Sequence, residues 1–391
     1  MNDLTPPNRS GEATARLRIA LLPAIFDPRL NYLENTFAHG LHAMGHEVVV
    51  FTTHHLGNGE ATDLSALDAT LPIGVVRSRR VIKIRRTLVP YDWTIRRRLR
   101  GLNPQVAFIL APNHGTGYHW MKRLPPQCRK IVIFSDLPWH RGGFATWFKR
   151  RWACRAIRMA DRVCTATEDT QRLVQEWAGP EFSSRVERIG LSFVPSLLEG
   201  GQTPAAAVAL AGRVQQVISC ITRVTSGKCL DSVFKAVERL LLSRPDAGLV
   251  MGGFGENPES HRLREIIAAS PVADRCVVLP MLNPSEIGGV FRLAACSLWS
   301  TVSIGIYHSL HCGCRVLVRG GQDATHLLAH PAAGAWFADD NQLTEALERL
   351  LEQPEDRAAA QAVAAPYTVE NVLTKLLRKV LPEATTLPGS A

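Results

Sequence analysis

Residues 17–53 read LRIALLPAIFDPRLNYLENTFAHGLHAMGHEVVVFTT, and the spacing of the apolar residues changes twice along them. The continuous apolar run at 17–26 is typical of a buried strand. Residues 31–45 place their apolar side chains at helical intervals, and Gly45 then ends the helix. A second apolar run follows at 46–53. A strand, a helix and a strand within about 40 residues predict a βαβ unit, and such units build parallel sheets.

The alternation of strands and helices continues to the end of the chain. In the first half we predict further strands at 105–112, 130–136 and 161–167, with a short edge strand at 185–190. In the second half the predicted strands are 214–222, 247–255, 275–280, 296–300 and 314–320, and the predicted helices are 230–245, 259–270, 285–295, 303–313, 340–360 and 368–381. Each half therefore has the pattern of a Rossmann-like α/β domain.

A chain of 391 residues is long enough for two such domains. Residues 195–207 read PSLLEGGQTPAAA, and their Pro, Gly and small residues predict the linker between them. We therefore expect a flexible tail at 1–16 and a first domain at 17–195. A second domain is expected at 208–365, followed by a C-terminal helix and tail at 366–391 that crosses back to the first domain.

Composition restricts the class of protein. Apolar residues make up 46% of the chain and charged residues 20%, which is ordinary for a globular protein. No apolar run reaches the ~18 residues that a membrane-spanning helix needs, and the polar N-terminus lacks the apolar core of a signal peptide. None of the nine cysteines forms a Cys-x-x-Cys pair, so we expect reduced, mostly buried thiols, no metal site and a cytoplasmic location.

The net charge of +10 is unevenly distributed, because residues 1–195 carry +12 and the remainder carries −2. The excess gathers at 77–86, 96–100 and 149–162. Such cations are either a solvated helix face or a surface that attracts phosphate groups. Because apolar residues alternate with the cations at 77–100, we expect this segment to contact an anionic membrane surface peripherally, at its inner face. Nucleic acid is not expected, since no motif that binds it is present.

The loop after the predicted strand at 214–222 reads Arg223-Val-Thr-Ser-Gly-Lys228. In open parallel sheets, ligands bind at the carboxyl ends of the strands. An arginine can donate to two phosphate oxygens at once and a lysine acts as a mobile point charge, so this pair can bind one diphosphate. Taken alone, the pair could equally be two solvated loop cations.

Two glycine-containing turns follow in the second half. The strand at 247–255 ends in Gly253-Phe-Gly255, and a later loop reads Ser303-Ile-Gly-Ile-Tyr-His308 before Cys312-Gly313. The later loop leads into the amino end of a predicted helix, where backbone N–H groups and the helix dipole favour anions.

In this order, these pieces resemble the C-terminal domain of GT-B fold glycosyltransferases, specifically the large retaining group called family 4 (GT4). The resemblance covers residues 17–381. The other pieces that carry it are Asn283-Pro284-Ser285-Glu286, Gly320-Gly321-Gln322-Asp323 and Tyr367-Thr-Val-Glu, with Asn31-Tyr-Leu-Glu-Asn35 and Gly45-His-Glu-Val48 in the first half.

The resemblance implies two Rossmann-like domains whose parallel sheets face a central cleft. It implies a nucleotide diphosphate sugar as donor, bound mainly by the second domain, and an acceptor bound mainly by the first. Transfer would occur with retention, without a cofactor or an obligatory metal. Arg223 and Lys228 would bind the diphosphate and stabilise the charge that develops as the sugar–phosphate bond breaks. Gly253 and Gly255 would let the backbone approach the nucleotide. Backbone N–H groups of Ser303, Ile304, Gly305, Ile306 and Tyr307 would donate to the diphosphate or the sugar.

The sequence departs from the family at the Glu-x7-Glu motif, whose two carboxylates bind the donor sugar and the ribose. The position of the second Glu is taken by His308, counted from Cys312-Gly313, and that of the first by Ser300 or by Ser303. A histidine can donate to a ribose hydroxyl, but its bond is weaker and depends on pH.

The first half departs as well, because the segment Asp27–Asn31 lacks the glycines that the family often has there. Asn31 is assigned to the acceptor side by resemblance. Asp136, after the strand at 130–136, is either a base or a helix cap, and His140 follows it. His114 follows the strand at 105–112 and would lie at the rim of the cleft.

Two interpretations remain open. The first is an active hexosyltransferase that acts on a cell-envelope, polysaccharide or lipid-linked acceptor. The second is a degenerate family member that acts as a binding subunit or as the partner of another transferase. Retention of Arg223 and Lys228 favours the enzyme, whereas loss of the two carboxylates favours the binding subunit. A nucleotide-binding oxidoreductase is not supported, because Gly-x-Gly-x-x-Gly is missing after the first strand.

Overall fold

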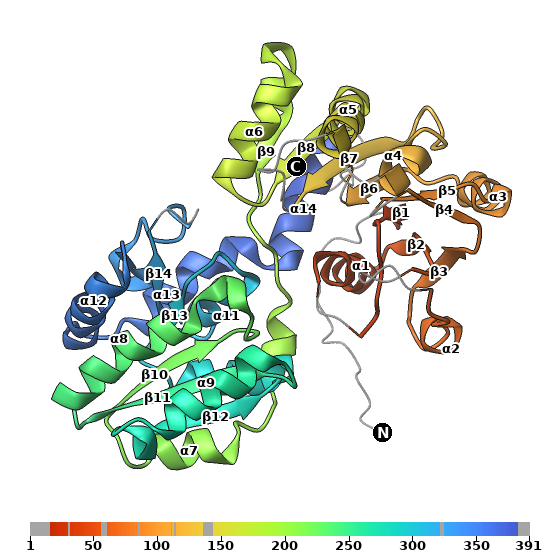
Figure 1. Cartoon of the computed structure of the whole chain (residues 1–391). Helices are drawn as coiled ribbons and strands as arrows, with labels where there is room; N and C mark the ends of the chain where they lie inside the picture. The colour runs from red at the N-terminus through yellow and green to blue at the C-terminus, as the bar shows by residue number, and fades with distance from the viewer. Residues whose placement is uncertain are drawn as a thin grey trace. The chain divides into compact units, whose positions relative to one another are not determined.

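The computed structural model describes residues 16–29, 32–55, 61–84, 87–110, 112, 115–135, 144–320 and 324–381. The chain divides into two compact units (Figure 1). The first unit comprises Met1–Thr165, Thr170–Glu187 and Leu373–Ala391, and the second comprises Ala166–Asp169 and Arg188–Val372.

The first unit is built on a seven-stranded sheet in the order β3-β2-β1-β6-β7-β8-β9, counted over the described residues. Pairing is parallel from β3 to β8. The alternating strand and helix pattern of the sequence is thus confirmed in this half. The strands are β1 (Arg18–Leu22), β2 (Glu47–Thr53), β3 (Gly74–Ser78), β6 (Val106–Leu110), β7 (Arg129–Phe134), β8 (Arg162–Thr165) and β9 (Val186–Arg188).

Helices cover this sheet through their apolar side chains. One face packs against α3, α4, α5 and α6 in a core that includes Leu99, Trp120 and Val174. A small antiparallel hairpin, β4 with β5, precedes α3. The bounds are α1 (Leu33–Ala43), α2 (Ser65–Asp68), α3 (Trp93–Leu102), α4 (Gly115–Met121), α5 (Phe144–Met159), α6 (Glu168–Ala178), β4 (Val81–Ile84) and β5 (Thr87–Pro90).

The second unit is built on a six-stranded parallel sheet in the order β12-β11-β10-β13-β14-β15, again over the described residues. Its strands match the predicted ones, and β15 is an additional edge strand. The bounds are β10 (Gln216–Ile221), β11 (Ala247–Phe254), β12 (Cys276–Pro280), β13 (Cys296–Trp299), β14 (Arg315–Arg319) and β15 (Gly334–Phe337).

Alternation along the strands gives the second sheet two apolar faces. Ile218 and Cys220 of β10 belong to the core under α8, α9 and α12, whereas Val217 and Ile221 belong to the core under α7, α10, α11 and α13. A sheet covered on both faces is typical of a doubly wound α/β fold. The bounds are α7 (Ala205–Ala211), α8 (Leu230–Ser243), α9 (Pro258–Ala268), α10 (Pro284–Leu293), α11 (Ile304–His311), α12 (Asp340–Glu352) and α13 (Arg357–Ala364).

The last helix, α14 (Val369–Val380), contributes to both units, because its residues from Leu373 onward belong to the first. Lys375 Nζ lies 3.8 Å from a carboxylate oxygen of Glu187, and the Nζ of Lys379 bonds to the same oxygen. The described part of α14 from Leu373 onward therefore belongs to the same unit as β1.

Two expectations from the sequence were wrong. The single helix predicted at 340–360 is two helices, since Pro354 cannot continue an α-helix and disfavours helical geometry at the residue before it. The linker predicted at 195–207 is instead packed into the second unit, whose longer segment is Arg188–Val372. Leu198 is buried there, and its carbonyl accepts a hydrogen bond of 2.9 Å from Arg292. None of the described helices is long and apolar enough to cross a bilayer.

Candidate functional site

The order of strands in the second sheet places a topological switch point between β10 and β13. From β10 the chain proceeds to β11 on one side, whereas β13 lies on the other, so the loops after β10 and β13 diverge. In open α/β sheets such a switch point is the usual ligand site. The loop that follows β10 holds Arg223 and Lys228, and the loop that follows β13 holds Ser300 and Ser303.

The loop after β10 presents two cations in different environments. Arg223 is exposed, and no carboxylate among the described residues pairs with it. Lys228 is half-buried and donates a hydrogen bond to the hydroxyl of Thr222. Burial lowers the pKa of Lys228, and the charge of Arg223 acts in the same direction. Two cations that destabilise each other are suited to bind an anion, because the anion relieves both the repulsion and the desolvation.

Gly253 has a structural role in the second unit, and its predicted approach to a nucleotide stays a prediction. Its φ is +102°, and a Cβ there would lie 2.2 Å from the carbonyl oxygen of Thr222. The backbone N–H of Val224 donates to the carbonyl of Gly253 over 3.1 Å. Glycine is thus required because the end of β11 presses against the loop that carries Arg223. At Gly255 no such limit exists, since a Cβ would meet nothing closer than 3.6 Å, and its N–H donates to Ser260 over 3.2 Å.

The loop after β13 leads into α11 through a helix cap. The hydroxyl of Ser303 accepts a bond of 3.3 Å from the N–H of Gly305, and its carbonyl accepts one of 3.1 Å from the N–H of Ile306. Two of the N–H groups that the sequence assigned to the donor are therefore bonded within the protein. Ile304 begins the helix, and Ser300, at the end of β13, is nearly buried.

Close packing between the end of β13 and the start of α11 holds this loop in place. A Cβ at Gly305 would lie 2.1 Å from the indole of Trp299, so only glycine fits there. The indole N–H of Trp299 donates to the hydroxyl of Ser297 over 2.7 Å. That hydroxyl also bonds to Ser309 over 2.7 Å. This buried network ties β13 to α11 and fixes the position of the loop between them.

Tyr307 and His308 direct their side chains into the second unit. The ring of His308 packs edge-on against Phe193 at 5.7 Å, and burial lowers its pKa to about 4. The imidazole is therefore neutral near pH 7 and cannot replace the charge of a carboxylate. The Tyr307 hydroxyl bonds to His326 over 2.8 Å, and its ring contacts Tyr367. A role for these two residues toward a donor stays a prediction.

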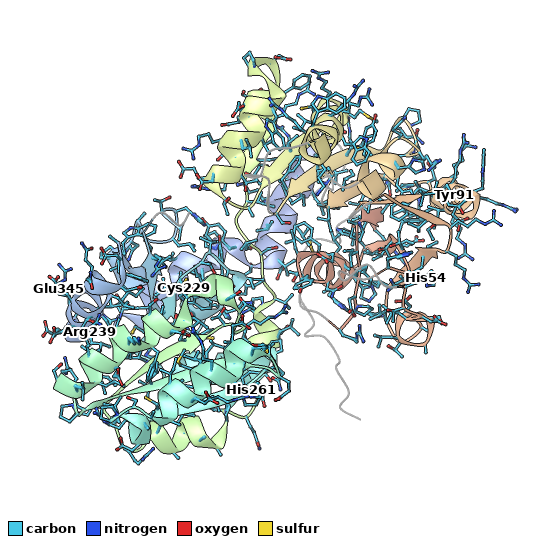
Figure 2. The ribbon with its side chains drawn as sticks, in the orientation of Figure 1. His54, Tyr91, Cys229, Arg239, His261 and Glu345 are labelled. Carbon is cyan, nitrogen blue, oxygen red and sulfur yellow. The ribbon has the colours of Figure 1, made fainter. Side chains whose placement is uncertain are left out.

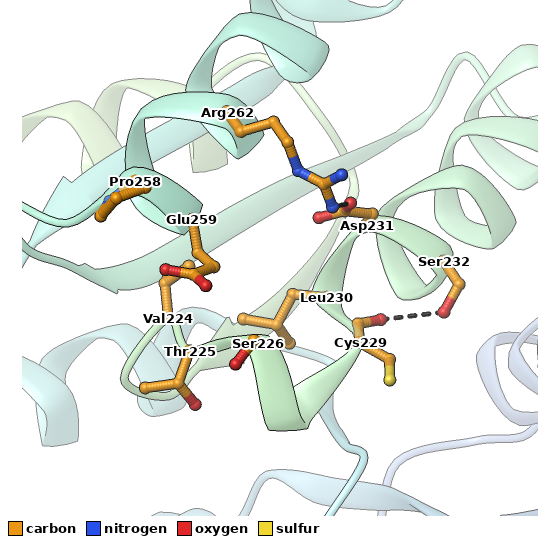
Figure 3. A pocket seen from close by; sticks show the side chains of 10 residues that line it. All are labelled: Val224, Thr225, Ser226, Cys229, Leu230, Asp231, Ser232, Pro258, Glu259 and Arg262. Carbon is orange, nitrogen blue, oxygen red and sulfur yellow. Dashed lines mark hydrogen bonds and ion pairs between the residues drawn. The ribbon is translucent and has the colours of Figure 1, made fainter.

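A pocket of about 620 Å³ lies beside the loop after β10, between the amino ends of α8 and α9 (Figure 3). Arg262 reaches across it to form an ion pair with Asp231, and Glu259 is a further carboxylate in its wall. Neither Arg223 nor Lys228 lines this pocket. Because its wall carries more acidic than basic groups, it is unsuited to a diphosphate, and the switch point remains the better candidate. Val224, Thr225 and Ser226 of the Arg223–Lys228 loop form part of its wall, but the sequence did not predict the pocket.

The first unit has its own switch point, between β1 and β6. Asn31, His114, Asp136 and His140, which the sequence assigned to the acceptor side or to catalysis, lie outside the described residues.

Polar groups at the end of β1 were missed by sequence reasoning. Asp27 is nearly buried, and its carboxylate accepts bonds of 2.8 and 2.7 Å from the guanidinium of Arg29, which lower its pKa. The amide of Asn35, in α1, donates to the carbonyl of Asp27 over 2.7 Å. Burial raises the pKa of the neighbouring Glu34 to about 7. These groups place two carboxylates of different pKa at the carboxyl edge of the sheet.

The basic segment at 77–100 forms the end of β3, the hairpin and α3. The side chain of Arg77 is buried and bonds to both carboxylate oxygens of Asp68 and to two backbone carbonyls. Ile82, Tyr91 and Trp93 are exposed to 52%, 47% and 73%. Tyr91 is labelled in Figure 2, among the projecting side chains of this unit. The segment thus combines a structural arginine with an apolar and cationic surface.

Comparison with known proteins agrees with this architecture. Residues 35–191 match the model of the glycosyl transferase 4-like domain. A glycosyltransferase from Rickettsia africae superimposes with a TM-score of 0.68 at 13% identity, over 94% of this chain and 97% of that one. Anabaena HepE, solved with UDP and glucose, gives 0.64 at 13% identity, over 93% and 100%. The fold is GT-B.

The GT-B fold does not by itself decide the reaction. A putative UDP-N-acetylglucosamine 2-epimerase from Listeria monocytogenes also superimposes, with a TM-score of 0.61 at 16% identity over 93% of this chain and 95% of that one. No curated protein matches the sequence. Among the described residues, no three His, Cys, Asp or Glu side chains gather in a group that could hold a metal ion.

Proposed function

We propose that this GT-B protein is a glycosyltransferase that transfers a sugar from a nucleotide diphosphate sugar to a carbohydrate or lipid-linked acceptor. The observation that carries the proposal is the position of Arg223 and Lys228, on the loop after β10 at the switch point of the second sheet. The match of residues 35–191 to a glycosyl transferase domain supports transfer over epimerisation.

In the proposed reaction, the bond between the sugar's anomeric carbon and the diphosphate oxygen breaks, and its electron pair remains on the diphosphate. Arg223 and Lys228 stabilise that charge, which supplies the electrostatic part of catalysis. The acceptor hydroxyl forms the new bond on the same face of the sugar and gives its proton to the departing diphosphate. Configuration is thereby retained, and neither a metal nor a cofactor takes part.

We propose uridine diphosphate as the nucleotide. Anabaena HepE was solved with UDP and with UDP-glucose, and MnaA from S. aureus was solved with UDP. The loop that holds Ser303 and Gly305 is expected to contact the sugar or the diphosphate, with Ser300 beside it.

The acceptor is expected on the first unit, which carries most of the positive charge. We propose that residues 77–100 contact an anionic membrane surface on which a lipid-linked acceptor is presented. The exposed Trp93 and Ile82 are suited to the interface, and the arginines of α3 are suited to the headgroups.

The alternative is a binding subunit without activity of its own. Ser300 and His308 supply no carboxylate where the family has glutamates, and the neutral, buried His308 has no charge to replace one. This alternative keeps nucleotide binding, or protein binding in its place, but has no turnover.

The first experiment is thermal unfolding with UDP, GDP and ADP and with their sugars, alongside Arg223→Ala and Lys228→Ala. A ligand at 100 times its Kd stabilises the folded state by about 2.7 kcal/mol. We expect UDP to raise the Tm of the wild type and to have at least tenfold weaker affinity for both variants, because each loses a charge-assisted bond. Arg213→Ala is the matched control, since this exposed arginine precedes β10 at the other edge of the sheet.

Turnover separates the two interpretations. Hydrolysis of a stabilising UDP-sugar, followed by the anomeric configuration of the released sugar, tests activity and retention together. If the wild type binds UDP but hydrolyses or transfers no more sugar than the two variants do at the same protein concentration, the result favours the binding subunit. Absence of any nucleotide effect would contradict the proposed donor site.

A further inference from the structure

A second cationic pocket lies in the first unit, at the opposite edge of the sheet from the expected substrates. Its volume is about 410 Å³. It is formed by α3, by Asn103 just after it and by the turn after α4. Those segments lead into the amino ends of β6 and β7. The pocket is therefore separated by the length of the strands from the carboxyl edge, where ligands of such sheets bind.

Four cations line this pocket, and no carboxylate does. Arg96 and Arg100 come from α3, and Lys122 and Arg123 come from the turn after α4. The rest of the wall consists of Asn103, Leu124, Pro125, Pro126 and Gln127. A pocket of four like charges without a counter-ion in its wall is unfavourable unless something negative occupies it.

The contacts of these side chains leave their charges uncompensated. Arg96 lies over the ring of Trp93 at 5.5 Å, and Lys122 lies over that of Tyr118 at 5.5 Å. Over the part of the chain that the structure describes, none of the four forms an ion pair. Burial lowers the pKa of Arg123, and repulsion from Arg96 lowers it further.

Helix ends do not account for the cluster. Cations often follow a helix because its last carbonyls carry partial negative charge. Here backbone groups already bond to those carbonyls: the N–H of Asn103 donates to Arg100, and those of Lys122 and Arg123 donate to Tyr118 and Trp120. The amide of Gln127 donates to that of Asn103 within the wall, whereas the side-chain donors of the four cations remain available to a ligand.

We propose that this pocket binds a phosphate group, either free phosphate or the headgroup of an anionic phospholipid. Guanidinium groups from two directions can each donate two hydrogen bonds to phosphate oxygens, and the lysine adds a mobile charge. The site is independent of the donor diphosphate, because Arg223 and Lys228 belong to the other unit.

The test uses the full chain with Arg100→Gln/Arg123→Gln, and Arg155→Gln/Arg158→Gln as the matched control. The control removes the same charge from exposed positions that do not line the pocket. Inorganic phosphate is titrated at low salt with Tm as the readout, in the wild type and in Arg223→Ala/Lys228→Ala. Cosedimentation with vesicles of phosphatidylglycerol, against phosphatidylcholine alone, is the second arm.

We expect phosphate to raise the Tm of the wild type, of the control and of Arg223→Ala/Lys228→Ala, and to bind Arg100→Gln/Arg123→Gln at least tenfold more weakly. Without phosphate, the pocket variant should unfold at a higher Tm than the wild type, because repulsion is relieved. A merely structural role would lower it instead.

The vesicle arm identifies the source of the phosphate group. Binding to phosphatidylglycerol that free phosphate inhibits, and that the pocket variant loses relative to the control, assigns a lipid headgroup. A phosphate effect on Tm without vesicle binding assigns free phosphate. Equal responses of the pocket variant and the control in both arms would overturn the proposal. UDP stabilisation, measured in parallel, remains a separate result about the donor site.

Discussion

The two units share a topology but place their uncompensated cations at opposite edges of the sheet. In the second unit, Arg223 and Lys228 lie at the carboxyl edge, next to the switch point. In the first unit, the acid-free cluster around Arg100 and Arg123 lies at the amino edge. The same fold therefore offers phosphate two environments. The site with Arg223 and Lys228 lies at the edge where ligands of such sheets bind. The cluster around Arg100 and Arg123 lies at the other edge of its sheet, where binding of a phosphate would leave the proposed reaction undisturbed.

This difference shows why net charge alone says little about function. The first half carries +12 and the second −2, yet the pair expected to do chemistry is in the second. Position relative to the strand ends, rather than charge density, is the basis on which we propose the reactive site. The predictions below test how far that distinction holds, in order of expected effect.

The largest effect is expected from Gly253→Ala, which is designed to move the loop of the second unit. The positive φ alone costs a non-glycine residue roughly 1–3 kcal/mol. The overlap of the new Cβ with the carbonyl of Thr222 adds to that cost. We expect a markedly lower Tm and loss of UDP stabilisation, measured by thermal unfolding. Gly255→Ala is the matched control and should change both little. Equal effects of the two substitutions would contradict the close-approach argument.

Much of the fold was predictable because the spacing of apolar residues within a short segment indicates its secondary structure. The strand predicted at 214–222 contains β10, and the stretch Asn283-Pro-Ser-Glu286 begins α10 with a capping box in which Asn283 and Glu286 bond to each other's backbone. The break at Pro354 also has a local signal, the proline itself, but the amphipathic pattern on both sides of it predicted one continuous helix.

The site was less predictable, because its geometry depends on contacts between distant segments. The sequence shows the spacing of Arg223 and Lys228, but it does not predict the hydrogen bond from Lys228 to the hydroxyl of Thr222. Nor could the requirement for Gly253, which depends on the approach of β11 to the preceding loop. Cys229 has a left-handed φ of +47°, for which the sequence offers no signal.

The second largest effect concerns acid stability and His308. Its pKa is lowered from 6.5 to about 4, so the folded state binds its proton less readily than the unfolded state. The contribution of the neutral His308 ring to the free energy of unfolding is therefore fully present above pH 6.5 and is lost as the pH falls toward 4. A shift of this size corresponds to roughly 3 kcal/mol. We expect His308→Leu to lose less stability than the wild type between pH 6.5 and 4, measured by urea unfolding.

His261→Gln serves as the control for that measurement, since its side chain is largely exposed (Figure 2). It should follow the wild-type curve. His326 and His119 also have pKa values lowered to about 4 by burial, so the protein with His308→Leu should still be partly acid-sensitive. An unchanged slope in His308→Leu would mean that protonation of this ring does not oppose folding.

A smaller effect is expected at the two helix caps of the second unit. Ser303→Ala and Asn283→Ala each remove a capping side chain, which costs about 1 kcal/mol. Only Ser303 belongs to the loop proposed to contact the donor. We therefore expect similar losses of Tm but weaker UDP binding in Ser303→Ala alone, measured by calorimetric titration. Equal UDP affinity in both variants would remove Ser303 from the donor site.

The smallest effect is expected at the return of the chain to the first unit. Lys379 and Lys375 both approach the carboxylate of Glu187, so Lys379→Gln leaves one partner in place. Both lysines are exposed enough for solvent to screen the interaction, which keeps its worth below about 1 kcal/mol. A double-mutant cycle with Glu187→Gln, followed by urea unfolding, measures it. A coupling above roughly 2 kcal/mol would instead mean that this ion pair, rather than the apolar face of α14, holds the last helix to the first unit.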